Sequence, residues 1–200
     1  MESVTSSSLL LRMRNPEDED AWEHFFSFYA PLILRYSRQC GCDRSMADDI
    51  LQETLVALMK TIPTFRYDRA RGRFRDYVRK VVRRRVGRAY KRSELRCSLE
   101  DHLHPDRRNQ ISDSKAVVPG AAWDELWDQQ LLRAALARVR DRVEPLTFRS
   151  FELYVLDERP TAEVQAVLGI ADRNTVYQHR SRVMKVLEEE MQKLREEVGE

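Results

Sequence analysis

Apolar residues recur along the chain with the three- and four-residue spacing of amphipathic helices. The first run follows Asn15-Pro16 and a cluster of acids, which is typical of a helix start, and we expect Pro31 to kink or divide this helix. Two further helices are predicted, from about Ser45 to Lys60 and from about Phe74 to Arg92. The apolar positions of the three helices are Trp22, Phe25, Phe26, Tyr29, Leu32 and Ile33, then Met46, Ile50, Leu55, Leu58 and Met59, then Phe74, Val78, Val81, Val82 and Tyr90.

The periodicity stops between about Ser93 and Gly120, and this length without a pattern indicates a flexible linker. It returns with a stripe formed by Trp123, Trp127, Leu131, Ala135 and Val139, and with a second stripe formed by Phe148, Phe151 and Val155. We therefore predict an all-α protein with two small helical domains. The expected segments are a disordered N-terminus (1–14), a first domain (15–92), a linker (93–120), a second domain (121–190) and an acidic tail (191–200).

The composition agrees with helices and says little about partners. Glycine and proline are scarce, and 35 Lys and Arg residues nearly balance 33 Asp and Glu residues. Three cysteines without a disulfide-rich spacing, and the absence of a secretory signal or an apolar membrane span, favour a cytoplasmic protein that does not enter a membrane.

The charge distribution is informative where the total is not. The stretch from Arg66 to Arg96 is densely basic, and on a helix Arg73, Lys80, Arg84, Arg88 and Lys91 share one face. Aromatic residues lie among these cations, namely Phe65, Tyr67, Phe74 and Tyr77. Cations that follow a phosphate backbone, together with rings that stack on bases, favour binding to single-stranded nucleic acid. The alternative is an ordinary solvated basic surface.

The chain near its end has the layout of a helix-turn-helix. A short helix from Thr161 to Leu168, with Val164, Val167 and Leu168 facing inward, precedes a turn at Gly169-Ile170. A last helix from about Asp172 is anchored by Val176, Val183 and Leu187. The residues left for solvent or for base edges in the major groove are Arg173, Asn174, Tyr177, Gln178, Ser181, Arg182 and Lys185. A plain helical hairpin is the alternative.

These features together resemble the extracytoplasmic-function group of bacterial sigma factors. The stretch Ala47-Asp-Asp-Ile-Leu-Gln-Glu53 is similar to the acidic helix with which this family grips RNA polymerase. The resemblance implies that Asp48, Asp49, Gln52, Glu53 and Leu55 bind core polymerase.

The stretch from Gly72 to Arg84 resembles the family's helix that opens and binds the downstream (−10) promoter element, with Tyr77 where tryptophan is usual and Arg84 where asparagine is usual. The residues implied here are Arg73, Phe74, Arg75, Tyr77, Lys80, Arg83, Arg84, Arg88 and Lys91. The helix-turn-helix resembles the domain that reads the upstream (−35) element. Its turn is one residue longer than the common form, which leaves the register of the base-contacting residues open by one position.

The expected partners are thus core RNA polymerase and promoter DNA, as duplex and as melted strand, and the resemblance adds an anti-sigma protein as a further candidate partner. We expect no enzymatic activity and no cofactor, because neither a phosphate-binding glycine loop nor a catalytic constellation occurs. A zinc site built from Cys40, Cys42, Cys97, His102 and His104 is disfavoured by the Cys-x-Cys spacing. The closer rival is a stand-alone helix-turn-helix regulator, which gives the N-terminal motifs no role.

Overall fold

The computed structural model describes residues 6–65, 72–103 and 120–198, and these residues form helices and turns without a β-strand. Their contacts divide the chain into two compact units. The first unit is Met1–Gln130 with Glu197–Glu200, and the second unit is Leu131–Glu196. The prediction of an all-α protein is confirmed.

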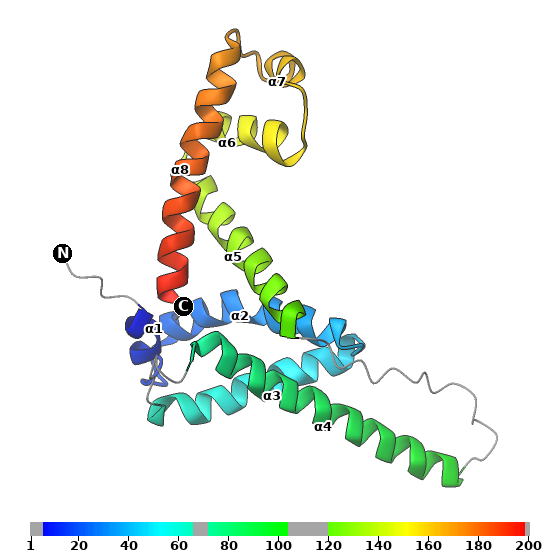
Figure 1. Ribbon diagram of the computed structural model, residues 1–200. Helices are drawn as coiled ribbons and strands as arrows, with labels where there is room; N and C mark the ends of the chain where they lie inside the picture. Colours follow the sequence, from blue (N-terminus) through cyan, green and yellow to red (C-terminus); the bar gives the residue numbers. More distant parts are fainter. Residues whose placement is uncertain (1–5, 66–71, 104–119, 199–200) are drawn as a thin grey trace. The chain divides into compact units, whose positions relative to one another are not determined.

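The first unit contains α1 (Ser6–Arg12), α2 (Glu19–Gln39), α3 (Arg44–Thr61), a short 3₁₀ helix η1 (Ile62–Thr64) and α4 (Phe74–Leu103) (Figure 1). α2 packs on α3 and α4, and α3 packs on α4. An aromatic cluster lies at their centre, where the rings of Phe25 and Tyr29 stack with centroids 4.4 Å apart and Phe74 meets both edge-on. These rings are almost fully buried, so the first unit has a hydrophobic core of its own.

The helix α5 (Gly120–Arg142) begins in the first unit and ends in the second. The fully buried rings of Trp123 and Trp127 contact α2, Trp123 packing edge-on against Tyr36 at 5.1 Å and Trp127 against Phe28 at 5.2 Å. The contacts thus place the boundary between the two units at Gln130, inside α5, whereas the sequence pattern placed the boundary between the two domains in the linker 93–120. The two indoles are the largest apolar side chains of α5, and α2 supplies the aromatic partners that bury them.

The second unit contains the rest of α5, then α6 (Pro145–Phe151), a π-helical turn η4 (Glu152–Leu156), α7 (Thr161–Leu168) and α8 (Arg173–Glu197). A small core joins η4, α7 and α8 through Leu153, Val164, Ile170 and Val176. Farther along α8, the buried carboxylate of Glu190 accepts hydrogen bonds from Arg142 of α5 and from Lys193. A buried charge requires such partners, and here they connect α8 to α5.

Several expectations about helix bounds are wrong. The segment 1–14 is not wholly disordered, because α1 buries Leu9 and Leu10 and the following Met13 is fully buried. α2 begins after Asp18, whose carboxylate accepts the amide hydrogen of Ala21, while Asn15 only closes a turn to Glu17. Of the two outcomes expected at Pro31, a kink or a division, the division does not occur, because α2 runs through this proline as one helix with buried residues on both sides.

Two helices extend farther than the periodicity indicated. α4 continues past Arg92 to Leu103, because the chain contains neither glycine nor proline there and a helix does not require an apolar stripe. α8 continues to Glu197 and buries Leu194, so the predicted acidic tail is largely helical. Some predicted core positions are instead exposed, namely Phe26, Met59 and Val167, at 47%, 48% and 56%. The buried stripes are therefore narrower than the apolar runs.

Candidate nucleic-acid and protein interfaces

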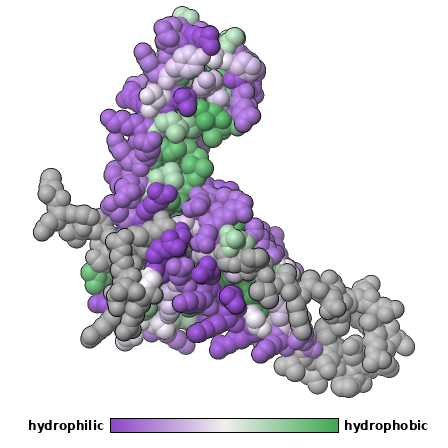
Figure 2. Space-filling model, viewed as in Figure 1, coloured by the Kyte–Doolittle hydropathy of each residue, from purple (hydrophilic) through white to green (hydrophobic). Residues whose placement is uncertain are grey.

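The helix α4 separates its apolar and basic residues onto opposite sides. Val78, Val82 and Val86 face the core and are at most 7% exposed. The exposed cations on the other side are Lys80, Arg83, Arg84, Arg88 and Lys91, which we call the basic face. In Figure 2, hydrophilic residues cover much of the visible surface of the described part of α4. The one-sided distribution predicted from the sequence is present.

The basic face is available for an external anion. Lys80, Arg83 and Arg84 line a shallow depression on the surface. None of the cations of the basic face forms an ion pair with another residue of the described ranges. Exposed guanidinium and ammonium groups gathered in this way attract phosphate and release its counterions.

Other cations of the same stretch are already engaged. Arg75 is 6% exposed, lies 5.1 Å from the ring centre of Trp127 and pairs with Asp124. Arg85 is half-buried and donates to the Val81 carbonyl, and Arg92 pairs with Glu53 at 2.8 Å. Arg66, Arg69, Arg71 and Arg96 lie outside the described side chains. The basic face therefore contains fewer cations than the basic stretch of the sequence does.

Two residues expected to contact the downstream element need correction. Phe74 is 1% exposed and belongs to the aromatic core, and Arg75 is covered by α5. Neither can reach a nucleic acid in this conformation. Sequence reasoning placed them on the interface because the resemblance concerned a whole motif, which contains core positions as well as exposed ones.

Tyr77 occupies the edge between the core and the basic face. Its ring packs against Phe65 with centroids 4.9 Å apart, and its hydroxyl donates to the Thr61 side chain at 3.2 Å. Arg14 donates to the carbonyl of Phe65 at 2.8 Å and so ties the end of η1 to the N-terminal segment. These contacts hold a half-exposed ring beside the cations, as base stacking requires.

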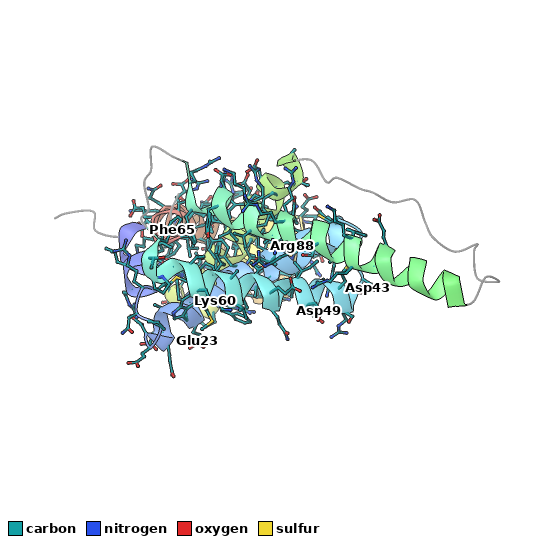
Figure 3. All side chains as sticks on the ribbon, turned by 90° about the horizontal axis from the view of Figure 1, so that it is seen from below. Glu23, Asp43, Asp49, Lys60, Phe65 and Arg88 are labelled. Atoms are coloured by element: carbon teal, nitrogen blue, oxygen red, sulfur yellow. The ribbon has the colours of Figure 1, made fainter. Side chains whose placement is uncertain are left out.

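A second candidate interface lies on α3. The helix is capped by Asp43, whose carboxylate accepts the amide hydrogen of Met46, and it buries Ala47, Ile50, Thr54 and Leu58. The opposite side exposes Asp48, Asp49 and Gln52, while Glu53 and Leu55 are half-buried. Figure 3 labels Asp49 on α3 and Arg88 on α4, the helix beside it.

Sequence reasoning missed two apolar members of the α3 surface. Val56 and Met59 are 51% and 48% exposed. Val56 lies four residues after Gln52, and Met59 lies three residues after Val56, so all three are neighbours on the surface of the helix. The sequence contained a signal for their exposure. Ala47, Ile50, Thr54 and Leu58 follow helical spacing and form the buried stripe, and Val56 and Met59 lie outside that stripe. Exposed apolar side chains bordered by polar ones match a protein-binding surface, which has an apolar centre and a polar rim.

In the second unit, α7 is followed by a turn at Gly169-Ile170 and by α8. Gly169 ends α7 in the left-handed conformation, with φ of 65°, which glycine adopts without strain. Asp172 accepts the amide hydrogen of Asn174, and the first residue of α8 is Arg173. Val176 and Val183 are fully buried and Leu187 nearly so, which agrees with the predicted anchors.

The side chains proposed for base reading differ in how they are held. Those exposed to solvent are Arg173, Asn174, Gln178, Ser181, Arg182 and Lys185. Tyr177 is half-buried: its ring packs edge-on against Tyr154 and its hydroxyl accepts a hydrogen bond from Arg173 at 2.9 Å. Hydrogen bonds with Thr161 and Arg173 lower the pKa of Tyr177. Tyr177 thus braces the start of α8.

The cysteines do not form a metal centre among the described residues. Cys40 and Cys42 are buried thiols, and burial raises the pKa of Cys40 to about 11, with a further contribution from Cys42. In the described part of the chain, no group of three or more His, Cys, Asp or Glu side chains could hold a metal. Cys97, His102 and His104 lie outside the described side chains. Among the helices described, none combines the length and the apolar character needed to cross a bilayer.

Comparison with known proteins assigns part of the chain. Residues 25–96 match the family model described as Sigma-70 region 2. The match covers most of α2, all of α3 and the part of α4 that bears the basic face, and it supports a sigma-70 family factor. No curated protein matches the chain. The second unit carries no family assignment from these comparisons.

Proposed function

We propose that this protein is a sigma factor of the extracytoplasmic-function type, which binds core RNA polymerase and directs it to promoters. The observation that carries the proposal is the basic face of α4, exposed on one side and lying within the segment that is similar to Sigma-70 region 2. The chain performs no chemistry in this proposal. A stand-alone helix-turn-helix regulator would leave the matched segment without a role.

In this mechanism each interface has a separate task. The α3 surface, with Asp48, Asp49 and Gln52 beside Val56 and Met59, binds core polymerase. The basic face of α4 follows the phosphates of the downstream element while Tyr77 stacks on an unpaired base, which offsets part of the unstacking cost. The exposed residues of α8 read the upstream element as a duplex. Two weak sites on one chain gain affinity when both can bind together.

The basic face is tested by reversing the charge of Lys80, Arg84 and Arg88 together. We expect holoenzyme with this variant to bind promoter DNA more weakly and to lose about 0.7 to 0.9 in the salt slope for each phosphate contact removed. The matched control reverses three exposed arginines elsewhere, Arg38, Arg44 and Arg133. An equal salt slope for both variants would identify the basic face as ordinary solvated surface.

The α3 surface is tested by co-migration of the purified chain with core RNA polymerase. We expect Asp49→Ala with Gln52→Ala to lose co-migration, because both side chains are exposed on α3 and can contact a partner there. The control is Asp20→Ala with Glu23→Ala, which removes exposed acids from α2. Retained co-migration of the α3 variant would place polymerase binding elsewhere.

The reading function of α8 is tested at one residue. Gln178 is exposed on the helix, about two and a half turns before the buried Leu187. We expect Gln178→Ala to cost about 1–3 kcal/mol at one base position of the upstream element and to leave the other positions unchanged. Equal discrimination among all upstream variants before and after the substitution would remove Gln178 from the reading residues.

A further inference from the structure

Three arginines form a row along the edge of α4. Arg75, Arg79 and Arg83 are spaced by four residues and so lie one above another on the helix. Arg83 is exposed and lines the depression with Lys80 and Arg84. The row thus leads from the basic face to the place where the start of α5 packs on the first unit.

The first two arginines of this row meet an acid that is distant in sequence. Asp124 of α5 lies 3.3 Å from the guanidinium of Arg75 and 3.9 Å from that of Arg79. Arg75 is held further by the indole of Trp127, and its side chain is only 8% exposed. Arg75 therefore serves as a buried anchor for the segment Gly120–Gln130.

Arg79 is held more loosely. Its side chain is 26% exposed, and its two carboxylate contacts, to Asp124 at 3.9 Å and to Asp76 at 3.5 Å, are longer than the roughly 2.7–2.9 Å of a charge-assisted hydrogen bond. Solvent-accessible pairs of this kind contribute little stability. A phosphate that occupies the depression beside Arg83 can therefore draw Arg79 from Asp124 without disturbing the core.

We propose that Arg79 is a further phosphate-binding residue of α4 and that Asp124 competes with nucleic-acid phosphate for it. This inference rests on the proposed function, because it extends the basic face by one cation. The segment Gly120–Gln130 thereby tunes how strongly the first unit holds nucleic acid. The carboxylate of Asp124 stands in for a phosphate while nucleic acid is absent.

The test compares two isosteric substitutions on the same helix. Asp124→Asn removes the competing charge, and Asp128→Asn removes an equal charge from an exposed neighbour on α5. Binding of the full chain to a fluorescently labelled single-stranded DNA of mixed sequence is measured by anisotropy over a range of salt concentrations. We expect Asp124→Asn to raise affinity about two- to five-fold and to steepen the salt slope by part of the roughly 0.7 that one full phosphate contact contributes, with little change for Asp128→Asn.

A background substitution identifies the released cation. In a chain that already carries Arg79→Gln, we expect Asp124→Asn to leave the salt slope unchanged. Equal slopes for Asp124→Asn and Asp128→Asn, an undiminished gain in the Arg79→Gln background, or no measurable binding by either variant at low salt would each overturn the inference.

Two further measurements separate possible failures. If Asp124→Asn impairs folding, Arg79→Gln alone still decides the question, because it should lower the slope more than Arg38→Gln does. If reversal of Lys80, Arg84 and Arg88 changes nothing, the proposed function fails. If that reversal acts as expected while the two Asp variants bind alike, only the role of Arg79 and Asp124 fails.

Discussion

The substitution Trp123→Ala tests whether the start of α5 is part of the first unit. The indole of Trp123 is fully buried and packs edge-on against Tyr36 of α2. Removing a buried tryptophan costs about 3–5 kcal/mol, of which the aromatic pair accounts for about 0.5–1.5. Because every 1.4 kcal/mol changes an equilibrium by about ten-fold, the population of the opened first unit should rise by roughly two to three and a half orders of magnitude.

Hydrogen exchange measured by mass spectrometry shows which unit is affected. We expect amides of α2 to lose protection in the Trp123→Ala variant, while amides of α6 and the N-terminal half of α8 keep theirs. The control is Leu132→Ala, which removes a side chain that is 41% exposed on the same helix and should have little effect. Loss of protection in α6 and α8 with α2 unchanged would refute the placement of Trp123 in the first unit.

Four further substitutions or treatments test local features. Burial alone would raise the pKa of Glu190, but hydrogen bonds from Lys193 and Arg142 outweigh it and lower the pKa. The stability contributed by the ionised group is therefore fully present above about pH 4.3, the ordinary pKa of glutamate, and it is lost as the pH drops through the lowered pKa. Urea unfolding at several pH values measures this loss, and Glu190→Gln should remove the pH dependence. A raised pKa and burial should make Cys40 react slowly with iodoacetamide until the protein is unfolded, and fast reaction of the native protein would contradict this. Gly169→Ala should destabilise the second unit by about 1–2 kcal/mol, because alanine adopts the positive φ of this position only with strain. Gly87→Ala should stabilise the first unit by about 0.5–1 kcal/mol, because Gly87 lies within α4 and has open space for a methyl group. Thermal unfolding measures both changes.

The sequence predicted what depends on local pattern. The basic face could be read from charges at helical spacing, because the opposite positions were apolar and had to be buried. The turn at Gly169 and the anchors Val176 and Val183 followed from the same reasoning. These predictions agree with the structure because a helix brings residues three and four apart together whatever surrounds it.

The sequence did not reveal contacts between distant segments. Nothing in the local pattern shows that Trp123 and Trp127 pack on α2, or that Asp124 meets Arg75. For the same reason Phe74 and Arg75 were expected on the interface, although partners far along the chain bury them. Burial of a helix position depends on which elements pack there, and that choice is made by the whole fold.

The helix α1 has a practical consequence for anyone who shortens this protein. Its residues look dispensable in the sequence, yet Leu9, Leu10 and Met13 are at most 7% exposed, and Arg12 forms a 2.7 Å ion pair with the cap of α2. A truncated version that starts at Asn15 would lose about 1.5–3 kcal/mol for each missing apolar side chain. It would also remove the hydrogen bond from Arg14 to the carbonyl of Phe65, which ties the end of η1 to the N-terminal segment. Affinity tags and protease sites at this end are best separated from Ser6 by a spacer.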